Sequence, residues 1–218
     1  MSTFGYRKPA DLPQTIALFP LEGAVLYPRG VLALNNFEPR YLNMIDDALG
    51  EQRLIGIIQP AVGDEQAVTP DFAEVGTVGR ITTFSETDDG RYLITLTGIA
   101  RFHLEREIKA ATPYRQALVS YDAFAEDFAP ASDCRIDRDE LMKSLKTYAA
   151  LHGFQVDWDS VEQAPTETVI NVAAQICPFD AVAKQALLEA ETLDERCRAL
   201  IALLEWDVAS DSTDRPMQ

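Results

Sequence analysis

Short apolar runs alternate with Gly, Pro and Asp from the N-terminus to about Phe124. Runs of this length, bounded by turn-forming residues, are typical of β-strands. The strand candidates are TIALF (15–19), VLALN (31–35), LIGIIQ (54–59), VGTVGRITTF (75–84), RYLITLTG (91–98), ARFHLEREI (100–108) and YRQALVSY (114–121). The pattern therefore predicts a β-rich module in this part of the chain.

Glycines mark a bulge and a turn within this module. The apolar residues of segment 75–84 recur every three positions, as in a helix, but Gly76, Gly79 and the paired threonines favour a strand that is bulged at a glycine. The dipeptide Asp89-Gly90 stands between two β-rich segments. It predicts a tight hairpin turn with positive φ at this point.

Beyond residue 136 the spacing of apolar residues becomes helical. Helices are predicted after Asp137, with Glu140 completing its cap, as far as Gly153; over 166–177; from Asp180; and after Thr192, which can form a capping box with Glu195. This part of the chain is therefore expected to be a small bundle of helices.

The predicted domain organisation follows from this change of pattern. We expect a β-rich domain over residues 1–123 and a helical bundle over residues 137–206. The stretch 124–136 is rich in Ala, Pro and acidic residues, which predicts a linker. Residues 207–218 carry too little apolar surface to order themselves, which predicts a flexible tail.

Composition excludes several classes of partner. The chain of 218 residues has 19 Lys and Arg against 35 Asp and Glu, a formal net charge of −16. This charge repels phosphate backbones and acidic lipid head groups, so neither nucleic acid nor membrane is an expected partner. RNA binding would need a local basic strip, and Arg80, Arg91 and Arg101 are too few and too scattered to predict one.

Cysteine usage and apolar content indicate where the protein resides. Cys134, Cys177 and Cys197 are odd in number and lie outside any CxxC motif, as expected for reduced thiols in the cytosol. The N-terminal residues lack the apolar core of a signal peptide, and no run is long enough to span a bilayer. We predict a soluble, cytoplasmic protein.

Motifs for catalysis are absent from the sequence. It contains no GxxxxGK[ST], HExxH, GxSxG or GxGxxG, and we expect neither a metal nor a cofactor. A Cys177–His152 pair stays open as a nucleophile and its base, although buried, inert thiols are the favoured interpretation. The acid pairs at 46–47 and 88–89 are interpreted as solvated charge.

Four segments together resemble a known family. They are residues 17–49, which include FPL and FEPRY; VGTVGRI (75–81); DDGRYLITLTGIARF (88–102); and CPFDAVAKQALLEAETLDERCRAL (177–200). In this order they resemble stand-alone bacterial proteins similar to the N-terminal, substrate-binding domain of the Lon protease. The resemblance implies an α+β fold: a PUA-like pseudo-barrel of six strands with one helix, followed by a small C-terminal helical bundle.

The same resemblance implies a module without catalytic activity. In full-length Lon the ATPase and the Ser–Lys peptidase lie in later domains, so the chain is expected not to be an enzyme. Two positions depart from the family pattern. Asn36 stands where an apolar residue usually precedes FEPRY. Ala183 stands where a Glu would complete a capping box with Asp180, a loss of about 1 kcal/mol.

FEPRY is the candidate structural or interaction motif. Pro39 suits the first position of a helix, Glu38 favours the positive end of the helix dipole, and Phe37 and Tyr41 can wedge the helix against the barrel. Arg101 is the predicted partner of Glu38. The motif residues are Phe37, Glu38, Pro39, Arg40 and Tyr41, together with Arg101. A structural role is favoured over a ligand site.

Two classes of function follow. The first is a module that binds unfolded or tagged polypeptide segments, an adaptor in protein quality control whose partners are client proteins and a Lon-type protease. It calls for an exposed apolar patch or groove on the barrel. The alternative is a small-molecule enzyme or ligand-binding protein with a site formed only in the fold, which calls for a pocket with perturbed titratable groups.

Overall fold

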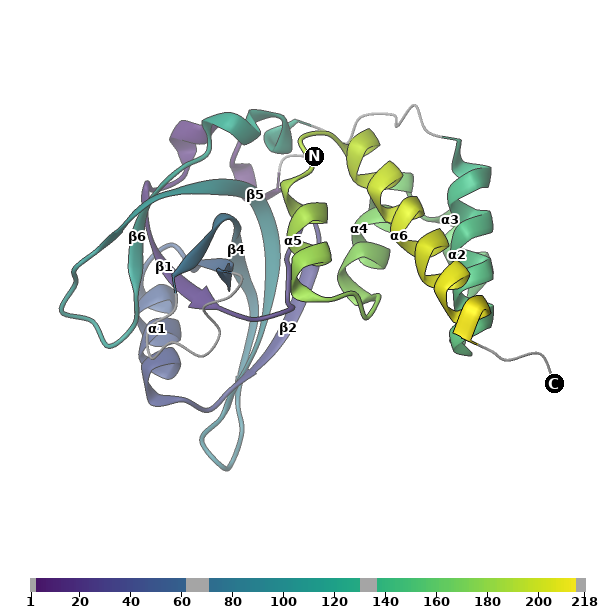
Figure 1. The fold of residues 1–218 in the computed structure, drawn as a ribbon. Coiled ribbons are helices and arrows are strands. Elements are labelled where there is room, and N and C mark those ends of the chain that lie inside the picture. The colour runs from purple at the N-terminus through teal and green to yellow at the C-terminus, as the bar shows by residue number, and fades with distance from the viewer. Residues whose placement is uncertain (1–2, 62–70, 130–136, 215–218) are drawn as a thin grey trace. The chain divides into compact units, whose positions relative to one another are not determined.

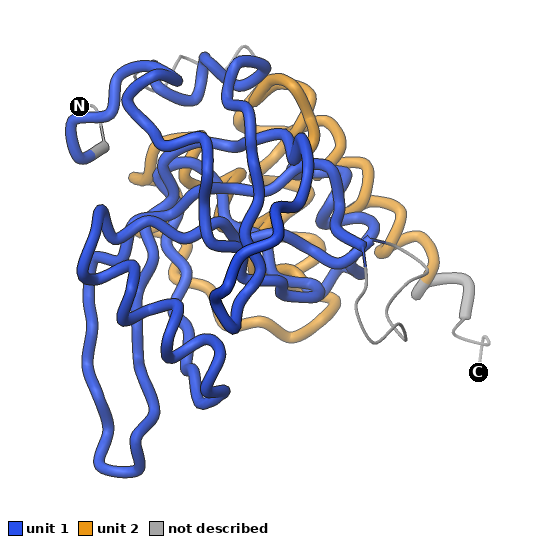
Figure 2. Tube along the Cα trace, turned by 90° about the vertical axis from the view of Figure 1, so that its left-hand side faces the viewer, with its two compact units in different colours: residues 1–130, 178–188 blue, residues 131–177, 189–218 orange. Residues whose placement is uncertain are grey.

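A computed structural model describes residues 3–61, 71–129 and 137–214, with side chains as far as residue 210 (Figure 1). The chain divides into two compact units, coloured separately in Figure 2. Residues 1–130 and 178–188 form the first, the barrel unit, and residues 131–177 and 189–218 form the second, the helical unit. The predicted domains place segment 178–188 in the helical bundle, whereas it belongs to the barrel unit.

The described residues of the barrel unit form one six-stranded, mixed sheet. Its strands are β1 Thr15–Pro20, β2 Val31–Asn36, β3 Leu54–Pro60, β4 Phe72–Glu86, β5 Tyr92–Ile108 and β6 Gln116–Ser120. The strand order is β2-β5-β4-β3-β1-β6, and β5 also pairs with β6, so the sheet closes on itself (Figure 1). The predicted strands and the α+β fold are confirmed.

Glycines shape the long strands, as the sequence indicates. Strand β4 is a strand and not a helix, and its register against β5 shifts between Val78 and Gly79. The turn between β4 and β5 has Gly90 at φ 77°. The segments predicted as 91–98 and 100–108 form a single strand, in which a side chain at Gly98 would collide with the backbone carbonyl of Tyr27. This close approach requires a glycine.

Helix α1, Pro39–Gly50, begins at FEPRY as predicted. Glu38 is the N-cap residue and Pro39 is the first helical residue. The helix buries Met44 and Ile45 completely, in a core cluster that includes residues of β3, β4 and β5. Packing of its apolar face against the sheet therefore holds α1 in place.

Helix α5, Ala181–Glu189, is joined to the barrel by buried polar groups. The Gln185 side chain donates to the Val75 carbonyl at 3.0 Å, and the Gln59 side chain donates to the Gln185 side-chain oxygen at 3.0 Å and to the Ala181 carbonyl at 3.1 Å. Lys184 reaches the carbonyl of Gly23 at 3.0 Å. Apolar spacing alone shows that this segment is a helix, but not which unit it packs against.

The helical unit contains α2 Arg138–His152, α3 Trp158–Gln163, α4 Thr166–Ile176 and α6 Leu193–Asp214. Gly153 ends α2 in the left-handed conformation, and Thr192 and Glu195 form the predicted capping box. The Asp137 cap accepts from the backbone of Asp139 instead of sharing a box with Glu140. Helix α6 continues past Trp206, so the predicted tail begins within a helix.

The predicted linker also begins with ordered structure. The short 3-10 helices are η1 Thr3–Gly5, η2 Pro9–Asp11 and η3 Asp122–Phe128. Helix η3 overlaps the start of the stretch 124–136, and its Phe124 and Asp127 are buried. Asp127 is ordered by an ion pair within the barrel unit, described below. Residues 130–136 of the predicted linker, with Cys134, lie outside the described residues.

Candidate functional site

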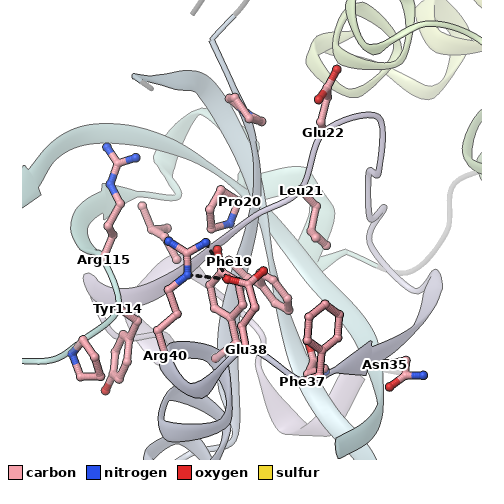
Figure 3. A pocket seen from close by; sticks show the side chains of 15 residues that line it. Phe19, Pro20, Leu21, Glu22, Asn35, Phe37, Glu38, Arg40, Tyr114 and Arg115 are labelled. Atoms are coloured by element: carbon pink, nitrogen blue, oxygen red, sulfur yellow. Dashed lines mark hydrogen bonds and ion pairs between the residues drawn. The ribbon is translucent and has the colours of Figure 1, made fainter. Parts of the chain in front are cut away.

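The FEPRY motif forms part of the wall of a groove in the barrel unit (Figure 3). The groove has a volume of about 660 Å³. It is built by the end of β1 and the turn after it, the end of β2, the start of α1 and the segment before β6. We call it the FEPRY groove. It is lined by residues 18–22, 35–38, 40–41, 60 and 113–115.

The FEPRY groove combines buried and exposed aromatic rings. The rings of Phe19 and Tyr41 lie with their centroids 4.2 Å apart, and both side chains are buried. Tyr41 thus wedges α1 against the barrel, as predicted. Phe37 does not, because its side chain is 65% exposed. At the end of β2 it is Asn36 that turns inward, where its amide donates to the Tyr92 carbonyl at 3.3 Å.

The predicted pairing of Glu38 with Arg101 is wrong. Figure 3 shows the Glu38 carboxylate facing the Arg40 guanidinium, whose Nε and Nη2 lie 2.9 and 2.8 Å from Oε2. Both side chains are about half exposed, and the guanidinium also stacks 4.6 Å from the centre of the Tyr41 ring. An exposed pair between residues two apart in sequence is worth about 0–1 kcal/mol.

Arg101 pairs instead with Asp127 of η3. Its Nε and Nη2 donate to the two carboxylate oxygens at 3.0 and 2.9 Å, and its backbone N–H donates to Oδ2 at 2.9 Å. Nη1 donates to the Leu188 carbonyl at 3.1 Å, and the guanidinium lies over the Phe124 ring. Both charged side chains are buried. Arg101 therefore joins β5, η3 and α5 and does not line the FEPRY groove.

Tyr41, Tyr114 and Arg115 contribute titratable groups to the groove. The Tyr114 hydroxyl donates to Asp47 at 2.7 Å, and burial, followed by this bond to a carboxylate, raises the pKa of Tyr114 to about 12. Burial likewise raises the pKa of Tyr41. Both phenols are therefore protonated at neutral pH. Arg115 forms an ion pair with Glu107 at 2.6 Å, which lowers the pKa of that carboxyl.

The cysteine and histidine alternatives lie in the helical unit. Cys177 and Cys197 are buried thiols. The His152 Nε2 atom lies 2.7 Å from Asp207 Oδ1, and its ring packs beside Tyr148. Within the ranges that the structure describes, no three His, Cys, Asp or Glu side chains gather as they would around a metal ion. The helices of those same ranges include none long and apolar enough to cross a membrane.

Backbone directions at the end of β1 limit the addition of a further strand beside the groove. The Leu18 N–H donates to the Arg115 carbonyl, whereas the Leu21 N–H donates to Ile58 of β3. Within β1, the register with β6 covers residues 15–17. The next backbone nitrogen on the groove side after Leu18 belongs to Pro20, which has no hydrogen to donate. Addition of a further strand is therefore disfavoured here.

Comparison with known proteins identifies relatives over most of the chain. A family model described as the ATP-dependent protease La (LON) substrate-binding domain matches residues 15–205. Lon protease 2 of Thermus thermophilus is 26% identical over 95% of this chain and 26% of its own length. Lon protease 2 of Myxococcus xanthus is 31% identical over 50% of this chain and 13% of its own length. The chain thus spans about a quarter or less of these relatives.

Solved structures share the fold. The crystal structure of a Lon N-terminal domain protein from Xanthomonas campestris has a TM-score of 0.59 and 26% identity, covering 88% of this chain and 98% of that one. The N-terminal domain of a Mycobacterium avium complex Lon protease has a TM-score of 0.62 over the same shares, at 14% identity.

Proposed function

This chain belongs to the LON substrate-binding domain family, and from that premise we propose that it is a non-catalytic module that binds unfolded or tagged polypeptide segments. We further propose that it acts as an adaptor in cytoplasmic protein quality control, together with a Lon-type protease. The family supports substrate recognition in general.

The observation that carries the proposal is the FEPRY groove with Phe37 at its rim. A volume of about 660 Å³ accommodates several residues of a polypeptide. Phe37 offers a large apolar surface that the fold leaves 65% exposed, and Pro20 and Leu21 add apolar side chains to the same lining. Aromatic side chains of this kind dominate binding energy in protein interfaces.

The charges of the groove support binding over catalysis. Glu38 and Arg40 neutralise each other at the start of α1, so an occupant meets polar groups without a strong net field. The nearby phenols have raised pKa values and supply no base at neutral pH. The groove is therefore large enough for a small-molecule substrate, but the pKa values of its tyrosines are shifted further from neutrality, away from the range that acid–base catalysis requires.

The test is binding of a fluorescently labelled, permanently unfolded polypeptide to the purified chain, measured by anisotropy. Phe37→Ala should weaken binding about tenfold, because it removes an exposed aromatic anchor. Phe84→Ala is the matched control, since Phe84 is also an exposed Phe of the barrel unit (42%) and lies outside the groove. Equal binding by the parent and both variants would refute the role of this groove.

A further inference from the structure

We propose that the helical unit carries a second binding groove, which takes an apolar polypeptide segment flanked by Lys or Arg residues. The identity of the occupant as a polypeptide rests on the proposed function. The groove, here called the α4 groove, has a volume of about 420 Å³ and lies between the end of α2, the segment after it, α3 and α4. Its lining includes Phe154, Val156, Trp158, Val172 and Ile176.

The α4 groove exposes apolar side chains that the fold does not cover. Ile176 is 71% exposed, Phe154 47%, Val172 46% and Val156 37%. Val172 and Ile176 are four residues apart on α4 and so share one face of that helix. The helix buries Ile170 and Ala174 on another face. Contiguous exposed apolar surface of this kind on a small protein marks an interaction site.

The walls of the groove are held in place without an occupant. The Arg138 guanidinium donates to the Thr166 hydroxyl at 2.7 Å and to the carbonyls of Val161 and Ala164 at 2.9 and 2.8 Å, which fixes α3 to the start of α4. On the opposite side, the ring of Phe154 stacks on His152 with centroids 5.8 Å apart. A groove formed in advance binds with less loss of conformational entropy.

The negative charge around the α4 groove favours an occupant with basic residues on either side of its apolar part. The helical unit contains 16 Asp and Glu against 7 Lys and Arg, a formal charge of −9. Asp157 and Asp159 adjoin Trp158 in the sequence, and both are exposed. Among nearby cations, Lys146 is paired with Glu162 at 2.8 Å, and Arg138 is directed at carbonyl groups. The excess negative charge attracts basic flanks and repels acidic ones.

The same charge argues against other occupants. A second copy of this chain would bring its own −16 against the −9 of the helical unit, and anionic lipid or nucleic acid would be repelled likewise. A segment with an apolar middle and basic ends can pack its middle against the apolar lining of the groove and place its ends near the acidic residues around it. The geometry therefore points to this one class of partner.

The experiment uses two labelled peptides with the same Leu, Phe and Val core, one with two Lys at each end and one with two Glu. Binding to the full chain is measured by anisotropy at low and high salt. We expect the Lys-flanked peptide to bind at least about tenfold more tightly than the Glu-flanked one at low salt, with the difference shrinking as salt screens the charges.

Variants locate the binding. Val172→Ser combined with Ile176→Ser should weaken the Lys-flanked peptide by at least about tenfold, and because both side chains are exposed the variant should fold as the parent does. Val182→Ser is the matched control, since Val182 is an exposed helical Val (54%) of α5 in the barrel unit. Unchanged binding by the double variant, or equal binding of the two peptides, would overturn the proposal.

The outcomes separate this inference from the proposed function. If the parent binds unfolded polypeptide and Phe37→Ala weakens that binding, while the α4 groove variant binds both peptides as the parent does, the second groove is refuted and the proposed function stands. If no unfolded polypeptide and neither peptide binds the parent, both are refuted. Circular dichroism melts confirm that each variant is folded.

Discussion

Loss of the Arg101–Asp127 ion pair should destabilise the barrel unit strongly. Both side chains are almost fully buried, at 4% and 8% exposure, and the carboxylate accepts two bonds from the guanidinium and one from the backbone N–H of residue 101. Asp127→Ala leaves a buried cation and a buried N–H without this acceptor. Breaking a buried pair costs about 3–5 kcal/mol, whereas a whole domain is stable by about 5–15 kcal/mol.

Equilibrium denaturation of the full chain measures this cost. Both tryptophans, Trp158 and Trp206, lie in the helical unit, so their fluorescence follows that unit, while near-ultraviolet circular dichroism of the tyrosines also follows the barrel. Asp127→Ala and Arg101→Met should each move the barrel transition by about 3–5 kcal/mol. The double variant should lose much less than the sum of the two, because no unpaired buried charge remains.

A contrary result is easy to recognise. If the barrel transitions of both single variants lie within about 1 kcal/mol of the parent's, the pair behaves as an exposed one. The assignment of Arg101 as the residue that joins β5, η3 and α5 would then be refuted. Additive losses in the double variant would show that the two side chains act independently.

Three further predictions follow from the FEPRY groove and the sequence. Glu38→Ala and Arg40→Ala should each change the free energy of unfolding by no more than about 1 kcal/mol in the same denaturation assay, because their pair is exposed. The pKa of Tyr114 in the folded chain is about 12, above the usual value of 10.0. The protonated phenol therefore contributes its full stabilisation below pH 10, and this stabilisation is lost as the pH rises through 12. Tyr114→Phe should flatten the pH dependence of the melting temperature between pH 10 and 12. The purified chain should neither hydrolyse ATP nor cleave casein, since its sequence lacks a phosphate-binding GxxxxGK[ST] loop; ATP-stimulated proteolysis that survives removal of contaminating proteases would contradict this.

Features that depend on residues close together in the sequence could be predicted from it. The strands follow from short apolar runs, and the start of α1 follows from Pro39. An N–H at the first helical position would have no partner within the helix, so proline, which lacks it, fits there without loss. The turn at Gly90 and the Thr192–Glu195 capping box are likewise local. In each case the residues that make the contact lie within a few positions of one another, so spacing alone carries the information.

Contacts between distant segments could not be predicted in this way. Asp127 lies 26 positions from Arg101 in a stretch without periodicity, so its composition indicated a linker and gave no sign of a buried acid. Charge and membership of the family motifs predict a pair between Glu38 and Arg101, whereas the actual partner, Arg40, stands only two positions from Glu38. The exposure of Phe37 depends on which residue of β2 faces inward, and the sequence around Asn36 leaves that direction open.

Residues buried in the barrel explain why the resemblance identifies a fold more securely than a function. Arg101 and Gln185 belong to segments that carry the resemblance, and both are nearly inaccessible because they hold α5 against the sheet. Such residues specify the architecture and leave no surface for a partner. Exposed side chains such as Phe37 and Ile176 can contact a partner without contributing much to folding. Under the proposed function, the choice of client would therefore be set in the FEPRY groove and the α4 groove, where a substitution can change binding while the barrel stays intact.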